Sequence, residues 1–405
     1  MTRHALISGA SIAGPALAHQ LDARGWRTTV LERAPRLRDE GQNIDVRGTA
    51  REVVRRMGLE DAALAAGTGE VGLRFVGDDG ATVAEFPAGE NDTDGGTAEM
   101  EILRGELSRL LYEATDDRTE YRFGEQIREL TDHGDHVSAA LSGGDTIDAD
   151  LVVVAEGLRS RTRALVMPDV EISEFGLHIA YLTIPRTADD DRWWRWHGAT
   201  GSRNVNLRPD NHGTTRAMLG FLSDVRGFDD LDRDGQITIL RRTFADVGWE
   251  APRILADLDD APFYFDSVGQ LRLDRWSSGR VVLLGDAAWS PGPFGTGTSL
   301  ALVGAYILAG ELAVGLAAGD DPGPALARYE ELMRPFVEQA QNVKPAVVRA
   351  MNPRTATGLK VQRAVLGVAA PVTRTFGGLV GKLTSPPADA ISLPDYPAPV
   401  ITARG

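Results

Sequence analysis

The chain has 405 residues, too many for one ordinary hydrophobic core, which predicts two domains or one domain with a large insertion. Its formal net charge of -15 argues against nucleic acids and anionic membranes as partners, because the overall field repels phosphate groups. It contains no Cys, which excludes disulfides, thiolate catalysis and Cys-ligated metals.

The N-terminal 18 residues combine basic, apolar and small residues, as a secretory signal does. The glycine spacing in the same stretch favours a nucleotide-binding βαβ unit instead. No apolar stretch reaches the roughly 20 residues that cross a bilayer. We therefore expect a cytoplasmic protein without membrane insertion.

The βαβ unit is predicted from four consecutive segments. Residues 4–8 form an apolar strand, residues 9–14 a glycine-rich turn, residues 14–24 a helix ended by Gly25, and residues 28–32 a second strand. The turn is Gly9-Ala10-Ser11-Ile12-Ala13-Gly14, a G-x-G-x-x-G pattern in which Ser11 replaces the middle glycine. The alternative is an ordinary strand-to-helix turn.

This unit would bind a dinucleotide with its backbone. The helix N-terminus directs a positive dipole end at a pyrophosphate, and Gly14 lets the helix pack close to the strand. Glu32 ends the second strand, where a carboxylate accepts hydrogen bonds from ribose hydroxyls. Arg33, next to it, could lie against the adenine or the pyrophosphate. A second glycine-rich turn of this quality is missing from the sequence.

Residues 101–114 predict a helix, with apolar spacing at Leu103, Leu107, Leu110 and Leu111. Arg104 lies in its first turn, where a cation opposes the helix dipole, so we expect a partner elsewhere. The alternative is a solvated surface arginine.

Two continuous apolar runs, residues 151–155 and 281–284, predict parallel strands that are buried on both faces. The first ends at Glu156-Gly157 and the second at Gly285-Asp286. Ligands of open α/β sheets bind beyond the carboxyl ends of the strands, so both carboxylates are well placed to meet one.

The ordered set of these motifs, which closes with Gly285-Asp286-Ala287-Ala288, resembles the class A flavoprotein monooxygenases, the group of p-hydroxybenzoate hydroxylase and the tetracycline-inactivating monooxygenases. The resemblance extends over nearly the whole chain. It implies an α/β fold in which a Rossmann-like FAD-binding domain carries an inserted, mostly antiparallel β-sheet substrate domain and C-terminal helices.

The resemblance also implies roles for single residues. Glu32 would bind the adenosine ribose, Arg33 and Arg104 the dinucleotide, and Asp286 the ribityl or pyrophosphate part of FAD. Residues 41–61 resemble the family segment that passes the flavin, which places Gln42, Asp45 and Arg47 near the ring system. The cofactor-binding candidates are therefore Gly9, Ser11, Ile12, Ala13, Gly14, Glu32, Arg33, Gln42, Arg47, Arg104, Asp286, Gly297 and Thr298.

The sequence departs from the family pattern at two positions. Glu156 replaces the usual Asp of a turn that the family associates with FAD and NADPH, which leaves the choice between NADH and NADPH open. Trp289 replaces the usual His, and we expect it to alter the cavity on the flavin side.

The segment after Asp286 predicts an irregular loop and then a helix. Gly297 permits close approach, and Thr298 or Ser299 can cap the helix. The helix N-terminus would then face the pyrimidine edge of an anionic reduced flavin. A plain capping role explains Thr298 equally well.

The domain prediction follows from alternating segments at residues 71–87, 175–186, 203–223 and 263–273, which indicate antiparallel strands. We assign 1–70, 97–168 and 270–345 to the FAD-binding domain and 71–96 and 169–269 to the substrate domain. Residues 346–405 form a C-terminal helical region, interrupted at Pro371 and Gly377-Gly378, and a Pro-rich surface tail. We expect the helical region to pack across the domains instead of lying on a membrane.

Residues 191–198 place three Trp in four positions. Trp194-Arg195-Trp196 invites comparison with the Trp-x-Trp-x-Ile-Pro motif of flavin halogenases, but His197-Gly198 does not continue it. Whether these rings touch a substrate stays open. The seven His show no metal-ligand spacing.

The resemblance implies an NAD(P)H-consuming monooxygenase that hydroxylates an aromatic or polyketide-like small molecule with O₂, through a C4a-hydroperoxyflavin. Arg47 is the candidate catalytic residue, because its cation could favour an anionic reduced flavin or an ionised phenol. The alternative for Arg47 is a structural role at a helix start. A flavin oxidase or reductase on the same fold and a non-catalytic flavin-binding protein are the alternative functions. The sequence indicates neither the substrate nor the oligomeric state.

Overall fold

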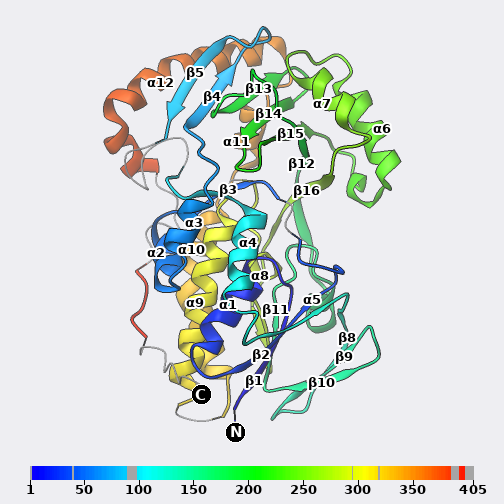
Figure 1. The fold of residues 1–405 in the computed structure, drawn as a ribbon, viewed down its shortest axis with the longest axis vertical. Helices are drawn as coiled ribbons and strands as arrows, with labels where there is room; N and C mark the ends of the chain where they lie inside the picture. The colour runs from blue at the N-terminus through cyan, green and yellow to red at the C-terminus, as the bar shows by residue number, and fades with distance from the viewer. Residues whose placement is uncertain are drawn as a thin grey trace.

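The computed structural model describes residues 2–38, 41–88, 98–293, 295–317, 320–384 and 392–396, and side chains within them except in 372–384. Figure 1 shows an elongated molecule with two parts, each built around a sheet. The N-terminus lies in the lower part of that view, and the helix α12 lies across the upper part.

The lower part contains a six-stranded sheet with the order β17-β18-β11-β1-β2-β7. Its neighbouring strands are parallel except β17 and β18, and the strands β1 and β11 are buried along their whole length. Burial on both faces explains why these strands are continuous apolar runs. Their bounds are β1 His4–Ser8, β2 Arg27–Glu32, β7 Glu120–Phe123, β11 Leu151–Val154, β17 Ser277–Ser278 and β18 Val281–Leu283.

Helices pack around this sheet. The central one is α9 (Gly297–Gly315), which contacts α1, α2 and α10 and is apolar around its circumference. The length and composition of α9 would allow it to cross a membrane, but 72% of its most apolar 18-residue stretch is buried in the protein, as in a core helix. The other helices of this part are α1 Ala13–Asp22, α2 Gly48–Arg56, α3 Glu60–Ala65, α4 Arg104–Glu113, α5 Arg161–Val166, α8 Asp286–Trp289 and α10 Gly323–Ala340.

The upper part contains a seven-stranded sheet with the order β16-β12-β15-β14-β13-β4-β5, antiparallel except for the pair β13 and β4. A second hydrophobic core lies between this sheet and the helices α6 (Arg233–Phe244) and α7 (Ala251–Asp257). The alternation in β14 explains the two faces, because Val205 and Leu207 enter that core while Asn204, Asn206 and Arg208 point the other way. The strand bounds are β4 Gly72–Val76, β5 Thr82–Pro87, β12 Ile172–Pro185, β13 Trp194–Ala199, β14 Arg203–Pro209, β15 Thr214–Leu222 and β16 Phe263–Leu271.

The small two-stranded sheet corrects one prediction. Residues 101–103 are not the start of a helix: they form β6 (Glu101–Leu103), which pairs with β3 (Asn43–Asp45), and α4 begins at Arg104. Pairing with a distant strand overrides the local helical spacing. The remaining elements are β8 Ile127–Asp132, β9 Val137–Leu141, β10 Thr146–Ala149 and the 3-10 helix η1 Phe228–Asp230.

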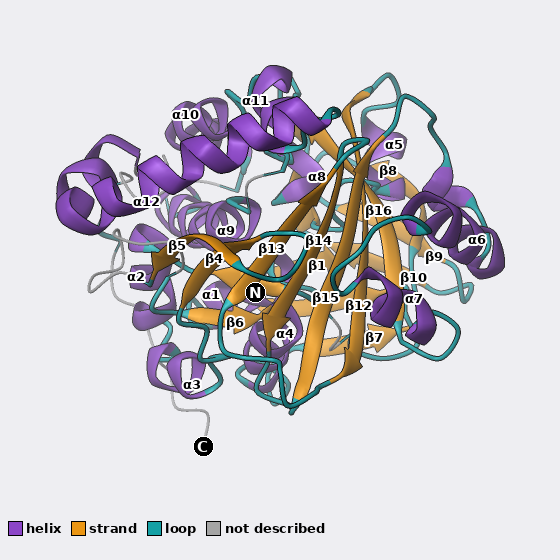
Figure 2. Cartoon of the chain, turned by 90° about the horizontal axis from the view of Figure 1, so that it is seen from above, coloured by secondary structure: helices purple, strands orange, loops and turns teal. Residues whose placement is uncertain are grey.

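The C-terminal region differs from expectation in one respect. The helix α12 (Ala356–Thr384) runs through Pro371 and Gly377-Gly378 without interruption. It packs along β5, at one edge of the large sheet, and α11 (Pro345–Met351) precedes it (Figure 2). Of the predicted tail, only 392–396 lies within the described residues, where Tyr396 donates a hydrogen bond to Glu311 of α9 at 2.6 Å. The domain boundaries given above stay a prediction.

Candidate functional site

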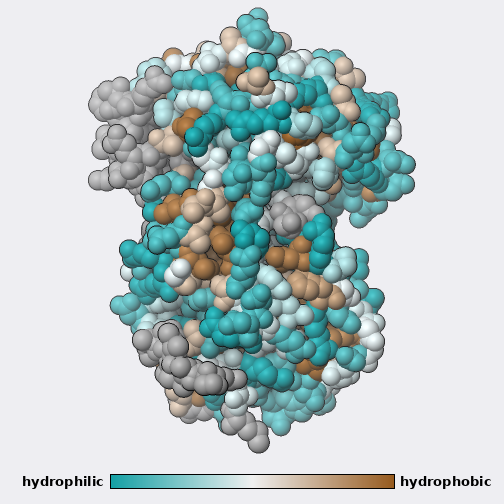
Figure 3. Space-filling view, viewed as in Figure 1, coloured by the Kyte–Doolittle hydropathy of each residue, from teal (hydrophilic) through white to brown (hydrophobic). Residues whose placement is uncertain are grey.

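Two cavities, of about 500 and 580 Å³, lie where the two parts of the molecule meet. Figure 3 shows apolar side chains gathered at this waist. Four residues line both cavities: Gln42, Arg104, Tyr181 and Tyr264. The cavities are therefore neighbours, and we call these four residues the partition.

The glycine-rich turn forms one wall of the first cavity, through Gly9, Ser11, Ile12 and Ala13. A Cβ atom on Gly9, which has φ +115°, would lie 2.4 Å from the carbonyl oxygen of Ala155. A Cβ atom on Gly14 would lie 1.9 Å from the carbonyl oxygen of Gly9, so Gly14 packs behind the turn as expected. The turn tolerates only glycine at both positions, and it directs the N-terminus of α1 at the cavity.

Ser11 occupies the position of the middle glycine and lines the cavity. The carbonyl groups of Ala10 and Ser11 both accept a hydrogen bond from the Ser108 hydroxyl of α4, at 3.3 and 3.2 Å. Ser108 thus fixes the turn from a helix that is distant in the sequence, a contact that the sequence analysis did not predict.

Glu32 lines the first cavity, but its carboxylate is already used by the protein. It accepts hydrogen bonds from the backbone N–H groups of Ala10 at 3.1 Å and Ala34 at 2.9 Å. Arg38 lies 3.7 Å from it and also lines the cavity, which the sequence did not predict. Arg33 is exposed and lines a separate hollow of about 30 Å³.

Glu156 also lines the first cavity, at the end of β11. Its carboxylate accepts hydrogen bonds from the hydroxyls of Ser8, Ser160 and Thr162, at 2.5 to 2.7 Å. Burial alone would raise the pKa of Glu156, but these hydrogen bonds outweigh it and hold the pKa below its ordinary value. This carboxylate joins β1 to the start of α5.

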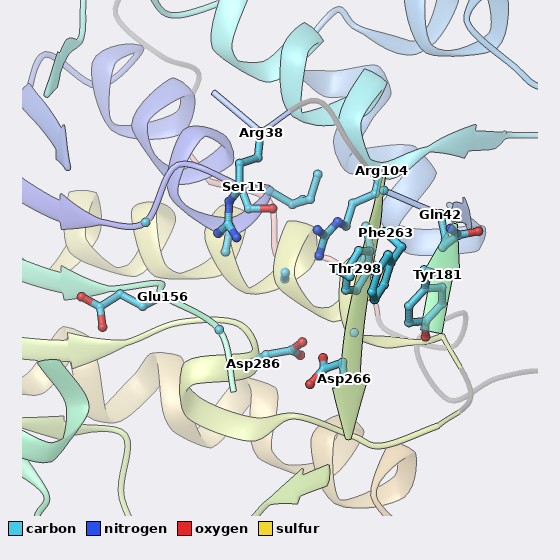
Figure 4. A pocket seen from close by; sticks show the side chains of 18 of the residues that line it. Ser11, Arg38, Gln42, Arg104, Glu156, Tyr181, Phe263, Asp266, Asp286 and Thr298 are labelled. Atoms are coloured by element: carbon cyan, nitrogen blue, oxygen red, sulfur yellow. The ribbon is translucent and has the colours of Figure 1, made fainter. Parts of the chain in front are cut away.

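Asp286 and Gln42 are residues of the first cavity with unused hydrogen-bonding capacity in the described chain, and Asp286 is the charged one. It begins α8 directly after β18, and its Oδ1 atom is buried without a hydrogen-bond partner among the described residues. Burial raises its pKa to about 6, Arg104 opposes this shift, and Asp266 adds to it. Figure 4 shows Asp286 and Asp266 pointing toward each other from α8 and β16.

Arg104 has the distant partner that its position predicted. It begins α4, and its guanidinium lies 6.0 Å from the ring centroid of Tyr264 on the large sheet. Tyr264 in turn stacks on Tyr181, with ring centroids 4.7 Å apart, because β16 and β12 pair these two residues. A cation and two stacked rings therefore form most of the partition.

The start of α9 corrects the predicted cap. Thr296 occupies the N-cap position, without a side-chain capping hydrogen bond in the described chain, and Thr298 and Ser299 lie inside the helix. Gly297 and Thr298 line the first cavity, whereas Thr296 and Ser299 line the second. The free N–H groups of this 19-residue helix are thus directed to the place where the cavities meet.

Trp289 does not shape a cavity wall, contrary to our expectation. It is 0% exposed, and its ring lies 4.5 Å from that of Trp276 and 5.9 Å from that of Tyr329, between centroids. Asp286 at the start of α8 lines the first cavity, whereas Trp289 at its end lies in the core.

The second cavity has one apolar and one polar wall. Its polar wall includes a chain of buried amides: Trp194 Nε1 donates to Asn206 at 2.9 Å, Asn206 to Asn204 at 2.7 Å, and Asn204 to Asn352 at 2.7 Å. This chain connects the sheet to α11. The apolar wall consists of Leu177, Ile179, Trp196, Met218, Val268, Val348 and Met351.

Arg47 lies at this second cavity instead of the first. It precedes α2, and its guanidinium lies 3.4 Å from Asp45, which lines the same wall. The sequence predicted Arg47 near the flavin ring, but the partition lies between Arg47 and the first cavity.

The residues of the first cavity fit a dinucleotide with a polyhydroxylated chain. Two glycines of the lining allow close backbone approach: a Cβ atom on Gly9 would collide with the backbone of Ala155, and one on Gly297 would lie 3.0 Å from Asp286 Oδ1. The unpartnered oxygen of Asp286 suits a hydroxyl donor. The N-termini of α1 and α9 supply positive dipole ends for anionic groups.

Sequence reasoning missed the contribution of the large sheet. The alternating polar residues of β12, β14 and β16 marked one face of each strand, but a strand pattern alone does not say what that face covers. The missed residues of the large sheet are Tyr181, Thr183, Asn204, Asn206, Arg208, Arg216, Phe263, Tyr264 and Asp266, and Arg38 and Arg233 were missed outside it.

Comparison with known proteins gives a family match over most of the chain. The profile of a family described as "FAD binding domain" matches residues 2–343. An uncharacterised protein of Mycobacterium tuberculosis, MT1298, is 40% identical over 343 residues, which are 83% of this chain and 91% of that protein. A flavin-dependent monooxygenase of Phoma sp, eupH, is 34% identical over 97% of this chain and 96% of its own.

A solved structure agrees with these relatives. The tetracycline destructase Tet(55) is 32% identical, with a TM-score of 0.80, over 98% of this chain and 99% of that one. The similarity includes both sheets and the C-terminal helices, since nearly all of each chain is covered.

Proposed function

This chain belongs to the FAD binding domain family and is a class A flavoprotein monooxygenase, and on this premise we propose that it hydroxylates an aromatic or polyketide-like small molecule, with FAD, NAD(P)H and O₂. The cytoplasmic location of the enzyme remains a prediction from the sequence.

We assign the first cavity to FAD. The turn from Gly9 to Gly14 would hold the pyrophosphate through its backbone, and Asp286 would accept a hydrogen bond from a hydroxyl of the ribityl chain. Glu32 holds this turn through two backbone N–H groups, one on each carboxylate oxygen, and the remaining lone pairs can accept from a ribose hydroxyl. Arg104 and Gln42, as part of the partition, line the end of the first cavity that adjoins the second.

When bound, FAD would supply the redox chemistry, accepting electrons from the nicotinamide and activating O₂ for transfer of one oxygen atom. The protein has three tasks around it. The first turn of α9 directs N–H groups at the partition. The stacked pair Tyr181 and Tyr264 forms the wall that the large sheet contributes between the cavities, and the apolar wall of the second cavity excludes water.

We assign the second cavity to the substrate. One observation carries this proposal: the two cavities share Gln42, Arg104, Tyr181 and Tyr264, so a group that fills the first lies against a molecule that fills the second. The aromatic and aliphatic wall suits a planar ring system, and the amide chain suits its oxygen substituents. Arg47 would then contact the substrate and stabilise an ionised phenol.

The test is a substrate panel with purified, FAD-loaded protein. Phenols, tetracyclines, polycyclic quinones and indoles are added singly, and the rate of NAD(P)H oxidation is measured together with product mass under ¹⁸O₂. We expect at least one class to stimulate NAD(P)H oxidation and to gain one labelled oxygen atom. Stimulated oxidation that gives only hydrogen peroxide would favour an oxidase or reductase, and a protein that binds no FAD would contradict the assignment of the first cavity.

A further inference from the structure

Beneath the polar wall of the second cavity lies a buried group of three charged side chains: Glu70, Glu101 and Arg208. Their exposures are 8%, 3% and 6%. They come from three separate segments of the chain: Glu70 precedes β4, Glu101 begins β6 and Arg208 lies on β14. We call them the acid pair and its arginine.

The hydrogen bonds divide unequally between the two acids. Arg208 donates to both oxygens of Glu70, at 2.7 and 2.9 Å, but to only one oxygen of Glu101, at 3.0 Å. The other oxygen of Glu101, Oε2, is buried without a partner among the described residues. An ionised carboxylate in that position would be costly, because a buried charge needs hydrogen bonds to all sides.

The charge count around the wall points the same way. Asp45 lies directly opposite Glu101 in the pair β3 and β6 and is paired with Arg47, and Arg104 is a further cation that lines the cavity. Within the buried group itself, the two carboxylates of the acid pair and the one cation of Arg208 sum to −1, and one proton on the acid pair brings that sum to zero. Burial raises the pKa of Glu101, and the charges of Glu70 and Asp45 add to this shift, whereas Arg208 and the neighbouring Asn43 amide oppose it.

Arg208 connects this charge to the cavity. Its guanidinium lies 4.2 Å from the ring centroid of Trp194, and both residues line the second cavity. Of its five N–H groups, three bond the acid pair and a fourth, on Nη1, lies 3.4 Å from the carbonyl oxygen of Asn43. The fifth, also on Nη1, has no partner in the described chain and is left for an oxygen of a ligand.

We propose that the acid pair shares one proton and so sets the charge of the substrate wall, which makes the cavity accept anionic aromatic ligands while the proton is held and reject them once it is lost. The proposal rests on the assignment of the second cavity to the substrate. Glu101 is a positioning residue here, since it acts through Arg208 and does not line the cavity.

The experiment uses two probes of equal shape and fixed charge: 2-naphthoate, which is anionic, and 2-naphthamide, which is neutral. The Kd of each is measured by calorimetry on the FAD-loaded protein from pH 6 to 9.5. For 2-naphthoate we expect Kd to rise on the order of tenfold across one titration step, and for 2-naphthamide we expect no step. Burial raises the pKa of the cavity tyrosines Tyr181 and Tyr264 above their ordinary value, so neither produces a step in this range.

Two variants separate the acid pair from other groups. Glu101→Gln keeps the oxygen that accepts from Arg208 but cannot ionise, so the step for 2-naphthoate should disappear. Glu70→Gln leaves Arg208 to Glu101 alone, so the step should move to lower pH, and this variant serves if the first does not fold. The control is Glu99→Gln, a carboxylate whose side chain is 57% exposed and bonded to Arg51, which should leave the step in place.

Three results would overturn the proposal. The first is a wild-type protein whose Kd for 2-naphthoate shows no step with pH, and the second is an equal step in the Kd for the neutral probe. The third is a step that persists in Glu101→Gln and keeps its midpoint pH in Glu70→Gln. The second would indicate a structural transition instead of a charge effect. Binding of neither probe would overturn the assignment of the second cavity, and with it the proposed function. Binding without a step would leave the proposed function standing and remove only this inference.

Discussion

The backbone of Gly297, the first residue of α9, lies against the carboxylate of Asp286, so closely that a Cβ atom there would be 3.0 Å from Oδ1. A residue at the start of one helix thus limits where the carboxylate at the start of another can lie. Both line the first cavity, and the contact gives the glycine a reason that the loop sequence alone did not supply.

Gly297→Ala should lower FAD affinity, because the added methyl group must displace the Asp286 carboxylate by a few tenths of an ångström. We expect FAD content after purification to fall while the melting temperature of the apoprotein changes little. The matched control is Gly248→Ala, where a Cβ atom would meet nothing within 4 Å. Equal FAD content in both variants would contradict the proposed role of this contact.

Asp286→Ala should weaken FAD binding by about 1–3 kcal/mol, or roughly 5- to 150-fold in Kd, since a hydroxyl would lose its acceptor in a buried site. Titration of apoprotein with FAD, followed by flavin fluorescence, measures the change. Asp274→Asn, at an exposed position, should leave Kd unchanged. An unaltered Kd for the Asp286 variant would count against this residue as a cofactor contact.

The apoprotein should show a pH dependence of stability that originates from Asp286. Its pKa is raised from 3.8 to about 6, so between these values the folded state holds a proton that the unfolded state has released. Stability therefore falls as pH rises from about 4 to about 6, by at most about 3 kcal/mol, and levels off above.

Asp286→Asn removes this contribution, so the variant should gain stability relative to the wild type as pH rises through the same window. Urea unfolding of both apoproteins at pH 4.5, 5.5 and 7 gives the difference directly. A difference that stays constant with pH would show that this carboxyl has an ordinary pKa.

Trp289→Ala should destabilise the fold by about 3–5 kcal/mol, because it leaves a cavity beside Trp276 and Tyr329 in the core. The folded fraction should still bind FAD, since the ring does not face the first cavity. Trp193→Ala, at a half-buried position under Arg74, should cost less. Selective loss of FAD binding in a variant of normal stability would place Trp289 at the cofactor after all.

Arg47→Gln should weaken the binding of anionic aromatic ligands on the order of tenfold and leave FAD content unchanged, because Arg47 lines only the second cavity. The control is Arg55→Gln on α2, the helix that Arg47 precedes, because the Arg55 side chain is 63% exposed. Calorimetry with 2-naphthoate distinguishes the two. Weakened FAD binding in the Arg47 variant would instead support its predicted place beside the flavin.

Much of the first cavity was predictable because its signals are local. A buried parallel strand appears as a continuous apolar run, and a glycine where no Cβ atom fits appears as a glycine, so β1, β11, β18 and the turn at Gly9 followed from short stretches. The place of Asp286 followed as well, since the end of a buried strand is also the edge where a sheet binds its ligands.

The second cavity depended on strand pairing between distant segments. Tyr181 and Tyr264 stack only because β12 and β16 pair in one register, and a shift of one strand by one residue would place the two rings on opposite faces of the sheet. The same holds for residues 101–103, which became a strand by pairing with β3, and for Arg208, which meets Glu70 and Glu101 across two sheets. The sequence alone thus determined which segments are buried strands and which residues end them at the first cavity, because burial and close approach restrict residue types locally. Only the tertiary structure decided which side chains share a cavity, because that depends on registers between segments far apart in the chain.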